Sequence, residues 1–384
     1  MTWSLVDRRR YRRLNVLERE PLLLAALVLL AVAFFVGTTF AARFYHRKQA
    51  AFGEQWFRRG EAALRQAHPG TAVEYFRNAL AYSQENDRYR LRLAQALLAA
   101  GRPQEAVSHL RELWDKEPGN GIVNLELGRL AARQGNVPQA MRFYHGAIFG
   151  AWPQDPERHR LETRLELSEF LLAQHASEQA HSELVALAAR LPQDNPDLHE
   201  RVGDLFLQAG SYARALYEFR AALQIDPQRE TAAAGAGEAA FLNGDYRTAQ
   251  RFLRRAVQAN LQDRHSAELL ATADLVISQD PFQPRLRAAE RARRAVQAFH
   301  TARARVEQCA HAEPQPELLQ ILERMKKTKR SARAELLRRN PDAMDKVMEL
   351  VFDGEATAAR HCGKPRGADL ALLLLAKQRE ATEP

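Results

Sequence analysis

The sequence predicts an all-α protein made of an array of short helices, and three observations support this prediction. Alanine, leucine, arginine, glutamate and glutamine, which are good helix formers, dominate the 384 residues. Alternating runs of β-branched residues are almost absent. The stretches 100–118, 209–227 and 243–261 repeat one pattern of small and apolar residues. Because 46% of the residues are hydrophobic, the chain can bury a core, which excludes a wholly disordered protein.

The first predicted element is the uncharged stretch 21–42, which follows a basic tail over residues 1–20. It is long enough to cross a bilayer core of about 30 Å as one helix, and it lacks the polar stripe of a soluble surface helix. A cleaved signal peptide is the main alternative, but its apolar region spans only about 7–15 residues. We therefore expect a retained single-pass transmembrane helix in a bacterial-type inner membrane.

Both flanks of this helix are basic, so the predicted orientation in the membrane depends on which flank has the stronger effect. Residues 1–50 hold nine Lys or Arg against three acids. Short flanks obey the positive-inside rule, whereas large domains translocate largely regardless of charge. The arginine-dense tail therefore favours a cytoplasmic N-terminus and an extracytoplasmic array. The opposite orientation stays open, because Arg43, Arg47 and Lys48 follow the helix.

Between residues 53 and 263 a pattern with a period near 34 residues recurs six times. A small residue is followed twelve positions later by alanine, and four positions further by an aromatic residue or leucine. Small residues would let the two helices of a pair approach closely, and the glycines after several first helices suit a left-handed C-terminal position. One pair cannot bury its apolar face alone, so neighbouring pairs are expected to stack. The extra residues 152–160 predict a loop insertion or a lengthened helix start. The six sets begin at Gly60, Ala94, Gly128, Ser168, Gly203 and Gly237.

This pattern resembles the tetratricopeptide repeat, a helix–turn–helix unit of about 34 residues. The resemblance implies a right-handed superhelix of six repeats over 53–263, whose first helices line a concave face that binds other proteins or extended peptide segments. At the positions that the family points into this face, one half of the array is basic, with Glu61 and Glu126 as exceptions, and the other is acidic, with Arg201 as an exception. A solvated helix face would also explain each residue taken singly. The basic set is Arg58, Arg65, Arg88, Arg92, Arg129 and Arg133, and the acidic set is Glu162, Glu166, Glu169, Asp197, Glu200, Asp204 and Glu238.

After residue 263 the repeat fades, and the sequence predicts a different helical region. We expect 264–278 to cap the array, 285–384 to form an additional helical module, and 318–339 to be one basic helix within it. The stretch 326–339 fits a solvated face, a surface for anionic lipid or acidic protein, or a nucleic-acid site; it lacks the aromatic residues that favour the last. Cys309 and Cys362 would pair as a disulfide outside the cytoplasm, and would otherwise be unrelated thiols.

No catalytic motif is recognisable in the sequence. The two cysteines have no C-x-x-C spacing and the twelve histidines are scattered, so we expect no metal site. Neither a P-loop nor G-x-S-x-G is present, and we expect neither enzymatic activity nor a cofactor. The sequence predicts a membrane-anchored scaffold for protein–protein interactions in periplasmic cell-envelope assembly. The alternatives are a cytoplasm-facing adaptor, similar to lipopolysaccharide-assembly regulators, and a nucleic-acid-associated factor that uses the basic C-terminal helix.

Overall fold

The computed structural model describes residues 19–380, so most of the basic tail predicted over 1–20 lies outside the described residues. Over that range the backbone forms eighteen helices and no strand, with one isolated bridge between Asn120 and Ala151. The all-α prediction is confirmed. The chain divides into two compact units, and the boundary lies between Thr163 and Arg164, inside one helix.

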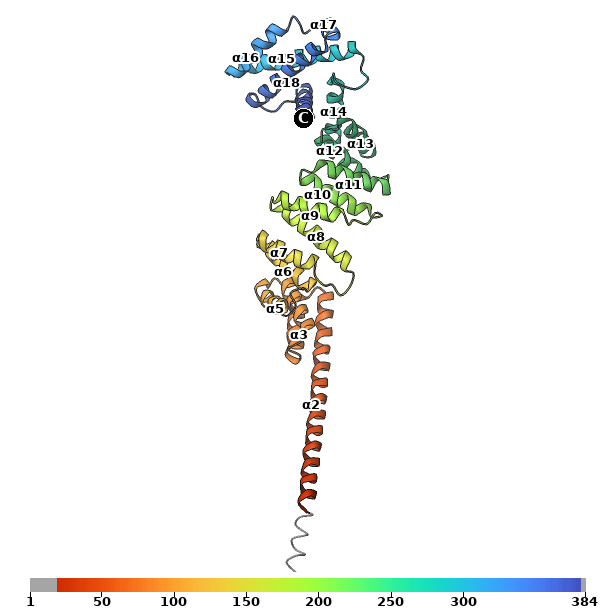
Figure 1. Cartoon of the computed structure of the whole chain (residues 1–384), viewed down its shortest axis with the longest axis vertical. Helices are drawn as coiled ribbons and strands as arrows, with labels where there is room; N and C mark the ends of the chain where they lie inside the picture. The colour runs from red at the N-terminus through yellow and green to blue at the C-terminus, as the bar shows by residue number, and fades with distance from the viewer. Residues whose placement is uncertain (1–18, 381–384) are drawn as a thin grey trace, which may run out of the picture. The chain divides into compact units, whose positions relative to one another are not determined.

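The first unit is a series of helix pairs that follow one another along the chain (Figure 1). Within pairs, α2 packs on α3, α4 on α5 and α6 on α7, while α3 contacts α4 and α5 contacts α6. This is the stacking that the repeated pattern predicts. The helices are α2 (Arg19–Arg65), α3 (Pro69–Tyr82), α4 (Asp87–Ala99), α5 (Pro103–Lys116), α6 (Gly121–Arg133), α7 (Val137–Ile148) and the start of α8 (Pro156–Ala173).

The second unit contains further pairs and ends in five helices of 6 to 25 residues. Here α10 packs on α11 and α12 on α13, and α14 follows against α13. The helices after α8 are α9 (Ser177–Ala188), α10 (Pro196–Gln208), α11 (Tyr212–Ile225), α12 (Glu230–Leu242), α13 (Tyr246–Ala259) and α14 (Arg264–Gln279). The C-terminal helices are α15 (Ala288–Ala312), α16 (Pro316–Thr328), α17 (Ala334–Arg339), α18 (Pro341–His361) and α19 (Gly367–Glu380).

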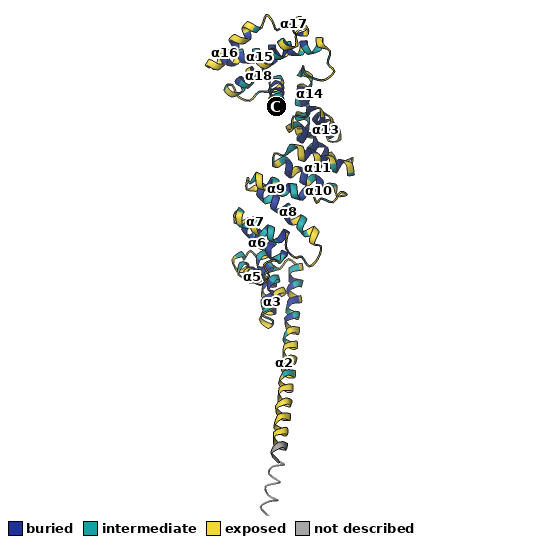
Figure 2. Ribbon diagram, in the orientation of Figure 1, coloured by how far each residue is buried: buried dark blue, intermediate teal, exposed yellow. Residues whose placement is uncertain are grey.

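Helix α2 joins the apolar segment to the first pair without a break. Its 47 residues, at about 1.5 Å per residue, give it a length of roughly 70 Å. Side chains of the apolar part, such as Leu29 and Phe34, are exposed, whereas buried positions begin at Gly53 (Figure 2). Among the described helices it is the one long and apolar enough to cross a membrane, by length and composition. The apolar segment and the first helix of the array are therefore one continuous element.

Glycines on the first helices set how closely the pairs pack, as the pattern predicts. A β-carbon added to Gly60 would lie 2.5 Å from the Phe76 ring, and one added to Gly237 would lie 2.6 Å from Cγ of Leu253. Both Phe76 and Leu253 are fully buried. Because no side chain fits between these helices, their backbones approach more closely than other residues would allow.

Each of the six first helices is followed by a residue with a left-handed backbone. Four of these residues are glycines with φ between 67° and 79°, which confirms that part of the pattern; they are Gly101, Gly135, Gly210 and Gly244. In the first and fourth pairs Ala67 and His175 take the same conformation, with φ of 58° and 57°. The left-handed residue turns the chain back, so that the second helix can pack on the first.

The insertion at 152–160 is a loop followed by a lengthened helix. Trp152 donates from Nε1 to the carbonyl of Ala147 (2.8 Å), and its ring stacks on that of His159 with centroids 4.4 Å apart. Helix α8 then runs for 18 residues, against 13 for α4, α6, α10 and α12. Both forms that the sequence allowed are therefore present together.

The last pair, α14 and the C-terminal helices share one hydrophobic core. Ala273 and Val276 of α14 are buried in the same cluster as Phe299 of α15 and Leu372 of α19. Helix α14 contacts both α13 and α19. The segment predicted to cap the array is thus also part of the core of the C-terminal helices.

The prediction of one basic helix over 318–339 is wrong. The chain leaves the helix after Thr328 and resumes at Ala334, so α16 and α17 are separate. Met325 and Leu337 are both buried, yet in one continuous helix they would lie about 120° apart around the axis. The turn between α16 and α17 lets both side chains reach the core.

Candidate functional site

We call the surface carried by the first helices of the pairs the helix-A face. It comprises α2, α4 and α6 in the first unit, and α8 from Arg164, α10 and α12 in the second. Both predicted charged sets lie on these helices.

Polar side chains on the helix-A face of the first unit form a ladder from pair to pair. Arg92 donates two hydrogen bonds to Glu61 (2.6 Å each) and one to Gln95 (2.9 Å). Gln95 donates to Glu126 (3.2 Å), whose carboxylate also lies 3.8 Å from the guanidinium of Arg129. The hydrogen bonds from Arg92 hold the pKa of the Glu61 carboxyl below its ordinary value. The ladder therefore joins neighbouring pairs and compensates the charges of two predicted basic residues.

The other four members of the basic set are less compensated. Arg58 and Arg88 approach the same carboxylate, Glu54, at 3.3 and 3.8 Å. Arg65 and Arg133 are exposed, and neither forms an ion pair with another described residue. Six arginines thus face three carboxylates on these helices, and the surplus positive charge suits a ligand that carries carboxylates.

Carboxylates on the helix-A face of the second unit are paired in the same manner. Arg201 donates from Nε to Glu169 (2.9 Å). Arg229, which directly precedes α12, donates to Glu200 (2.6 Å) and also pairs with Asp197. Three of the predicted acidic residues therefore act first as links between neighbouring pairs.

Asp204 differs from these residues, since no described cation lies at ion-pair distance from it. Burial raises the pKa of Asp204 to about 6, helped by the negative charges of Glu200 and Glu238. Glu238 itself lies 3.3 Å from the imidazole of His265. A cationic ligand side chain near Asp204 would meet a carboxylate that is charged at neutral pH and loses its charge below about pH 6.

The remaining two acidic residues lie on α8. Glu162 precedes the boundary and pairs in the first unit with Arg158 (2.8 Å). Glu166 follows the boundary and is half-buried in the second unit. The structure therefore places the basic set on the helix-A face of the first unit and six of the seven acidic residues on that of the second, whereas Glu162 lies on the part of α8 that belongs to the first unit.

Glu54 and Arg229, which are partners in these pairs, were not predicted from the sequence. The signal available was spacing: Arg92 lies 31 residues after Glu61, and Arg201 lies 32 after Glu169. An arginine and a carboxylate about one repeat apart on first helices fall side by side once the pairs stack.

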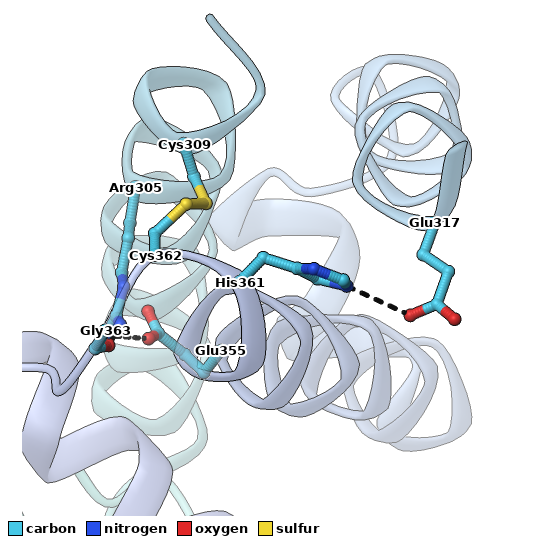
Figure 3. Close-up of a disulfide and its surroundings, with 7 residues drawn as sticks. All are labelled: Arg305, Cys309, Glu317, Glu355, His361, Cys362 and Gly363. Carbon is cyan, nitrogen blue, oxygen red and sulfur yellow. Dashed lines mark hydrogen bonds and ion pairs between the residues drawn. A yellow bond between two sulfur atoms is a disulfide. The ribbon is translucent and has the colours of Figure 1, made fainter. Parts of the chain in front are cut away.

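Cys309 and Cys362 are joined by a disulfide, with Cα atoms 5.9 Å apart (Figure 3). Beside it, Arg305 donates to the fully buried Glu355 (2.9 Å) and to the carbonyl of Gly363 (3.2 Å), the residue after Cys362. Burial, reinforced by a nearby negative charge, raises the pKa of Glu355 to about 8. The bond and the arginine thus hold the connector between α18 and α19 against α15.

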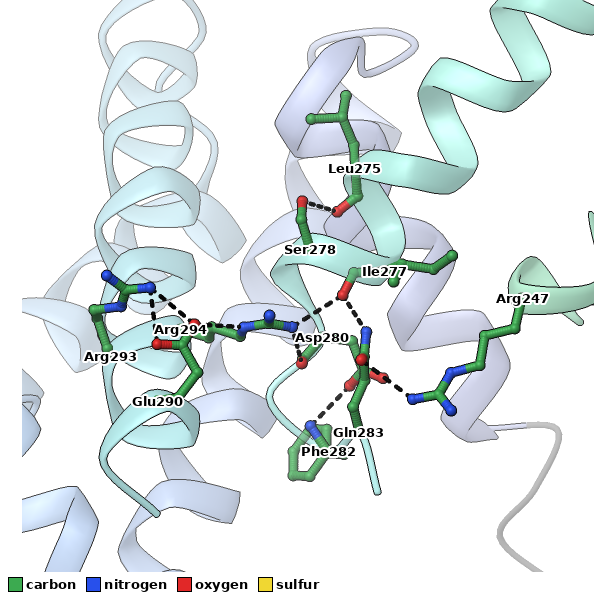
Figure 4. A network of polar contacts seen from close by, with 10 residues as sticks. All are labelled: Arg247, Leu275, Ile277, Ser278, Asp280, Phe282, Gln283, Glu290, Arg293 and Arg294. Carbon is green, nitrogen blue, oxygen red and sulfur yellow. Dashed lines mark hydrogen bonds and ion pairs between the residues drawn. The ribbon is translucent and has the colours of Figure 1, made fainter. Parts of the chain in front are cut away.

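A second polar network holds α15 to the end of α14 (Figure 4). Arg294 donates to the carbonyls of Ile277 and Asp280 (3.0 Å each), which compensates carbonyls left free where α14 ends. Gln283 also donates to Ile277 and accepts from Arg247 of α13 (3.2 Å). These contacts are structural. Within the described part of the chain, no group of three or more His, Cys, Asp or Glu could hold a metal ion.

Comparison with protein families agrees with this geometry. Sequence profiles described as tetratricopeptide repeat match residues 57–120, 97–148, 168–230 and 206–273, more than half of the chain. The chain belongs to the tetratricopeptide repeat family. The profiles match both units of this tetratricopeptide repeat protein, and they end before the C-terminal helices.

Several known proteins are similar to parts of the chain. A tetratricopeptide repeat-containing thioredoxin of Arabidopsis thaliana, TTL4, is 31% identical over 104 residues, which are 27% of this chain and 15% of TTL4. The chain therefore matches only a small share of that relative. The structure of Pseudomonas aeruginosa PilF superposes with a TM-score of 0.41 at 16% identity, over 58% of this chain and 99% of PilF. YrrB, described as having an unusual peptide-binding site, gives 0.41 at 15% identity, over 51% of this chain and 97% of YrrB.

Proposed function

We propose that the chain is a membrane-anchored, non-enzymatic scaffold that binds extended segments of other proteins on its helix-A faces. Its role would be the assembly or maintenance of a bacterial-type cell envelope. The observation that carries the proposal is the continuity of α2, in which an exposed apolar stretch from Leu23 onward runs directly into the first repeat. A helix of this kind would fix the repeats at the surface of the bilayer that holds it.

We further propose that the N-terminus is cytoplasmic and the repeats are extracytoplasmic. The arginine-dense tail supports this orientation through the positive-inside rule. The pairing of Cys309 with Cys362 supports it as well, because disulfides persist in oxidising compartments and are rare in the cytosol. A cytoplasm-facing adaptor would keep both thiols reduced.

The redox state of the cysteines in living cells tests the orientation. Cells are quenched with acid, and the denatured protein is treated with a maleimide that increases its mass, with and without prior reduction. We expect wild-type protein to react only after reduction, and the matched Cys362→Ser variant to react at Cys309 without it. Wild-type protein that reacts without reduction, together with a cytoplasmic signal from a topology reporter placed after residue 50, would favour the cytoplasmic adaptor.

Binding at the basic helix-A face is tested by reversing the charges of two arginines that are not part of the ladder. Arg65→Glu with Arg133→Glu should remove acidic partners from the proteins that co-purify with the full chain, because both side chains are exposed and unpaired within the described residues. The control reverses two exposed arginines of the C-terminal region, Arg330 and Arg333. If the partners do not change in the first variant, its residues are ordinary solvated side chains. Loss of salt-dependent DNA or RNA binding in the control variant would instead favour the nucleic-acid alternative.

The acidic face allows an independent test at Asp204. If a cationic segment binds there, its affinity should fall between pH 7.5 and pH 5, because the carboxylate with a pKa of about 6 becomes neutral. In Asp204→Asn the affinity should be lower at pH 7.5 and should depend less on pH. Identical pH profiles for the two proteins would contradict a role of Asp204 in binding.

A further inference from the structure

Helices α11 and α13, the second helices of two consecutive pairs, carry a surface rich in arginine. Together they contain six arginines and one acid, and no lysine. The acid, Glu218, is buried and lies 2.7 Å from the His199 imidazole, so it does not contribute to the surface. The exposed side chains of the two helices are therefore positively charged wherever they are charged at all.

Aromatic side chains lie among these arginines. The guanidinium carbons of Arg220 on α11 and Arg251 on α13 lie 5.8 and 5.3 Å from the centroid of the Phe252 ring. Side chains of the two helices thus meet in one surface. Tyr217 is three positions from both Arg214 and Arg220, on the same side of α11, and is 70% exposed. We call Arg214, Tyr217, Arg220, Arg251, Phe252 and Arg255 the outer arginine face.

Three of the four arginines of this face are not compensated by carboxylates of the described residues. Arg220, Arg251 and Arg255 have no carboxylate at ion-pair distance among the described residues. The neighbouring Arg254 has one at 3.9 Å, on Asp274. On the helix-A face, by contrast, Arg92 makes two hydrogen bonds of 2.6 Å to Glu61. The chain therefore pairs arginines between its repeats but leaves those of the outer arginine face open to a ligand.

We propose that the outer arginine face is a second binding surface, separate from the helix-A face, for an acidic segment of a partner protein. Guanidinium groups bind carboxylates through two parallel hydrogen bonds, which lysine cannot do. Tyrosine and arginine are also among the side chains that contribute most at protein interfaces. The segment would place carboxylates on Arg220, Arg251 and Arg255, and an apolar side chain on Tyr217 and Phe252.

The test uses the full chain in detergent micelles and a short fluorescein-labelled peptide of Asp and Glu, with leucine at every fourth position. Tyr217→Ala with Arg220→Gln and Arg251→Gln should weaken binding by about tenfold or more. The matched control, Leu336→Ala with Arg330→Gln and Arg333→Gln, removes the same charge and one exposed apolar side chain elsewhere. The control should weaken binding less than about twofold, since it leaves the face intact. Circular dichroism of both variants checks that the helices remain folded.

Four results would overturn the proposal. Equal losses in the variant and the control would mean that the peptide binds to the overall positive charge. Unchanged binding in the face variant would mean that the surface is only solvated. If the face variant instead loses affinity for oligothymidylate or for phosphatidylglycerol vesicles, and not for the peptide, the ligand is a nucleic acid or a membrane. Arg220→Lys with Arg251→Lys keeps the charge, so binding at wild-type strength in this variant would contradict recognition by guanidinium groups.

Discussion

Replacing Gly237 by alanine should destabilise the second unit, although alanine is the better helix former. The added β-carbon would lie 2.6 Å from Cγ and 3.0 Å from the backbone nitrogen of Leu253, which is fully buried. The first atom is a branch point and the second is backbone, so rotation of the side chain alone cannot relieve the contact. Helices α12 and α13 would have to move apart.

The expected size follows from two opposing effects. Alanine in place of glycine favours a helix by about 1 kcal/mol. Overpacking a buried site costs about 1–3 kcal/mol, and contact with backbone places this site toward the upper end. We expect the free energy of local unfolding to fall by about 1–2 kcal/mol, which corresponds to roughly 5- to 30-fold faster exchange.

Hydrogen–deuterium exchange of the full chain, followed in peptides from α12 and α13, measures this change locally. Gly70→Ala is the matched control, because an added β-carbon there has no atom within 4 Å. In Gly70→Ala, exchange in peptides from α3, which contains Gly70, should be unchanged or slower than in the wild type. In the Gly237→Ala background, Leu253→Ala should cost less than it does alone, because it makes room for the new methyl group. If Gly237→Ala behaves like Gly70→Ala, close backbone approach does not limit the packing of the pairs.

Three further predictions concern interactions within each unit. Cys309→Ser with Cys362→Ser should lower the unfolding free energy of the second unit by roughly 3–5 kcal/mol, since the bond closes a loop of 53 residues; urea unfolding with and without reductant measures this, and identical curves would contradict it. Burial raises the pKa of Glu355 from 4.5 to about 8, so the folded state holds an extra proton in that window and stability should fall as the pH rises through it. In Glu355→Gln the urea midpoint should lose this pH dependence, and parallel profiles would show that Glu355 does not cause it. Arg92→Glu should destabilise the first unit, and adding Glu61→Arg should recover about 0.5–1 kcal/mol in a double-mutant cycle; an additive result would remove the ladder as a source of stability.

Most of the fold could be predicted because the signals that specify it are local. Gly60 and Phe76 lie within one pair, and Gly101 follows the helix that it ends. A short stretch of sequence therefore contains both the residues that specify the packing or the turn and the helices that they affect. The basic helix at 318–339 could not be predicted correctly for the opposite reason. Its break depends on the core that receives Met325 and Leu337, which α16 and α17 share with α15 and α18, so it depends on how several helices assemble.

The charged surfaces could be predicted from the sequence only in part. The sequence by itself determined which helices carry Arg92, Arg201 and the other charged residues, because the period assigns each position to a first or a second helix. Only the tertiary structure decided which charges are compensated, since Arg92 reaches Glu61 when neighbouring pairs stack, whereas Arg251 lies over the Phe252 ring and has no carboxylate at ion-pair distance among the described residues. An ion pair depends on a separation of a few ångströms between side chains of different repeats, and a repeat period fixes the order of helices but not that distance.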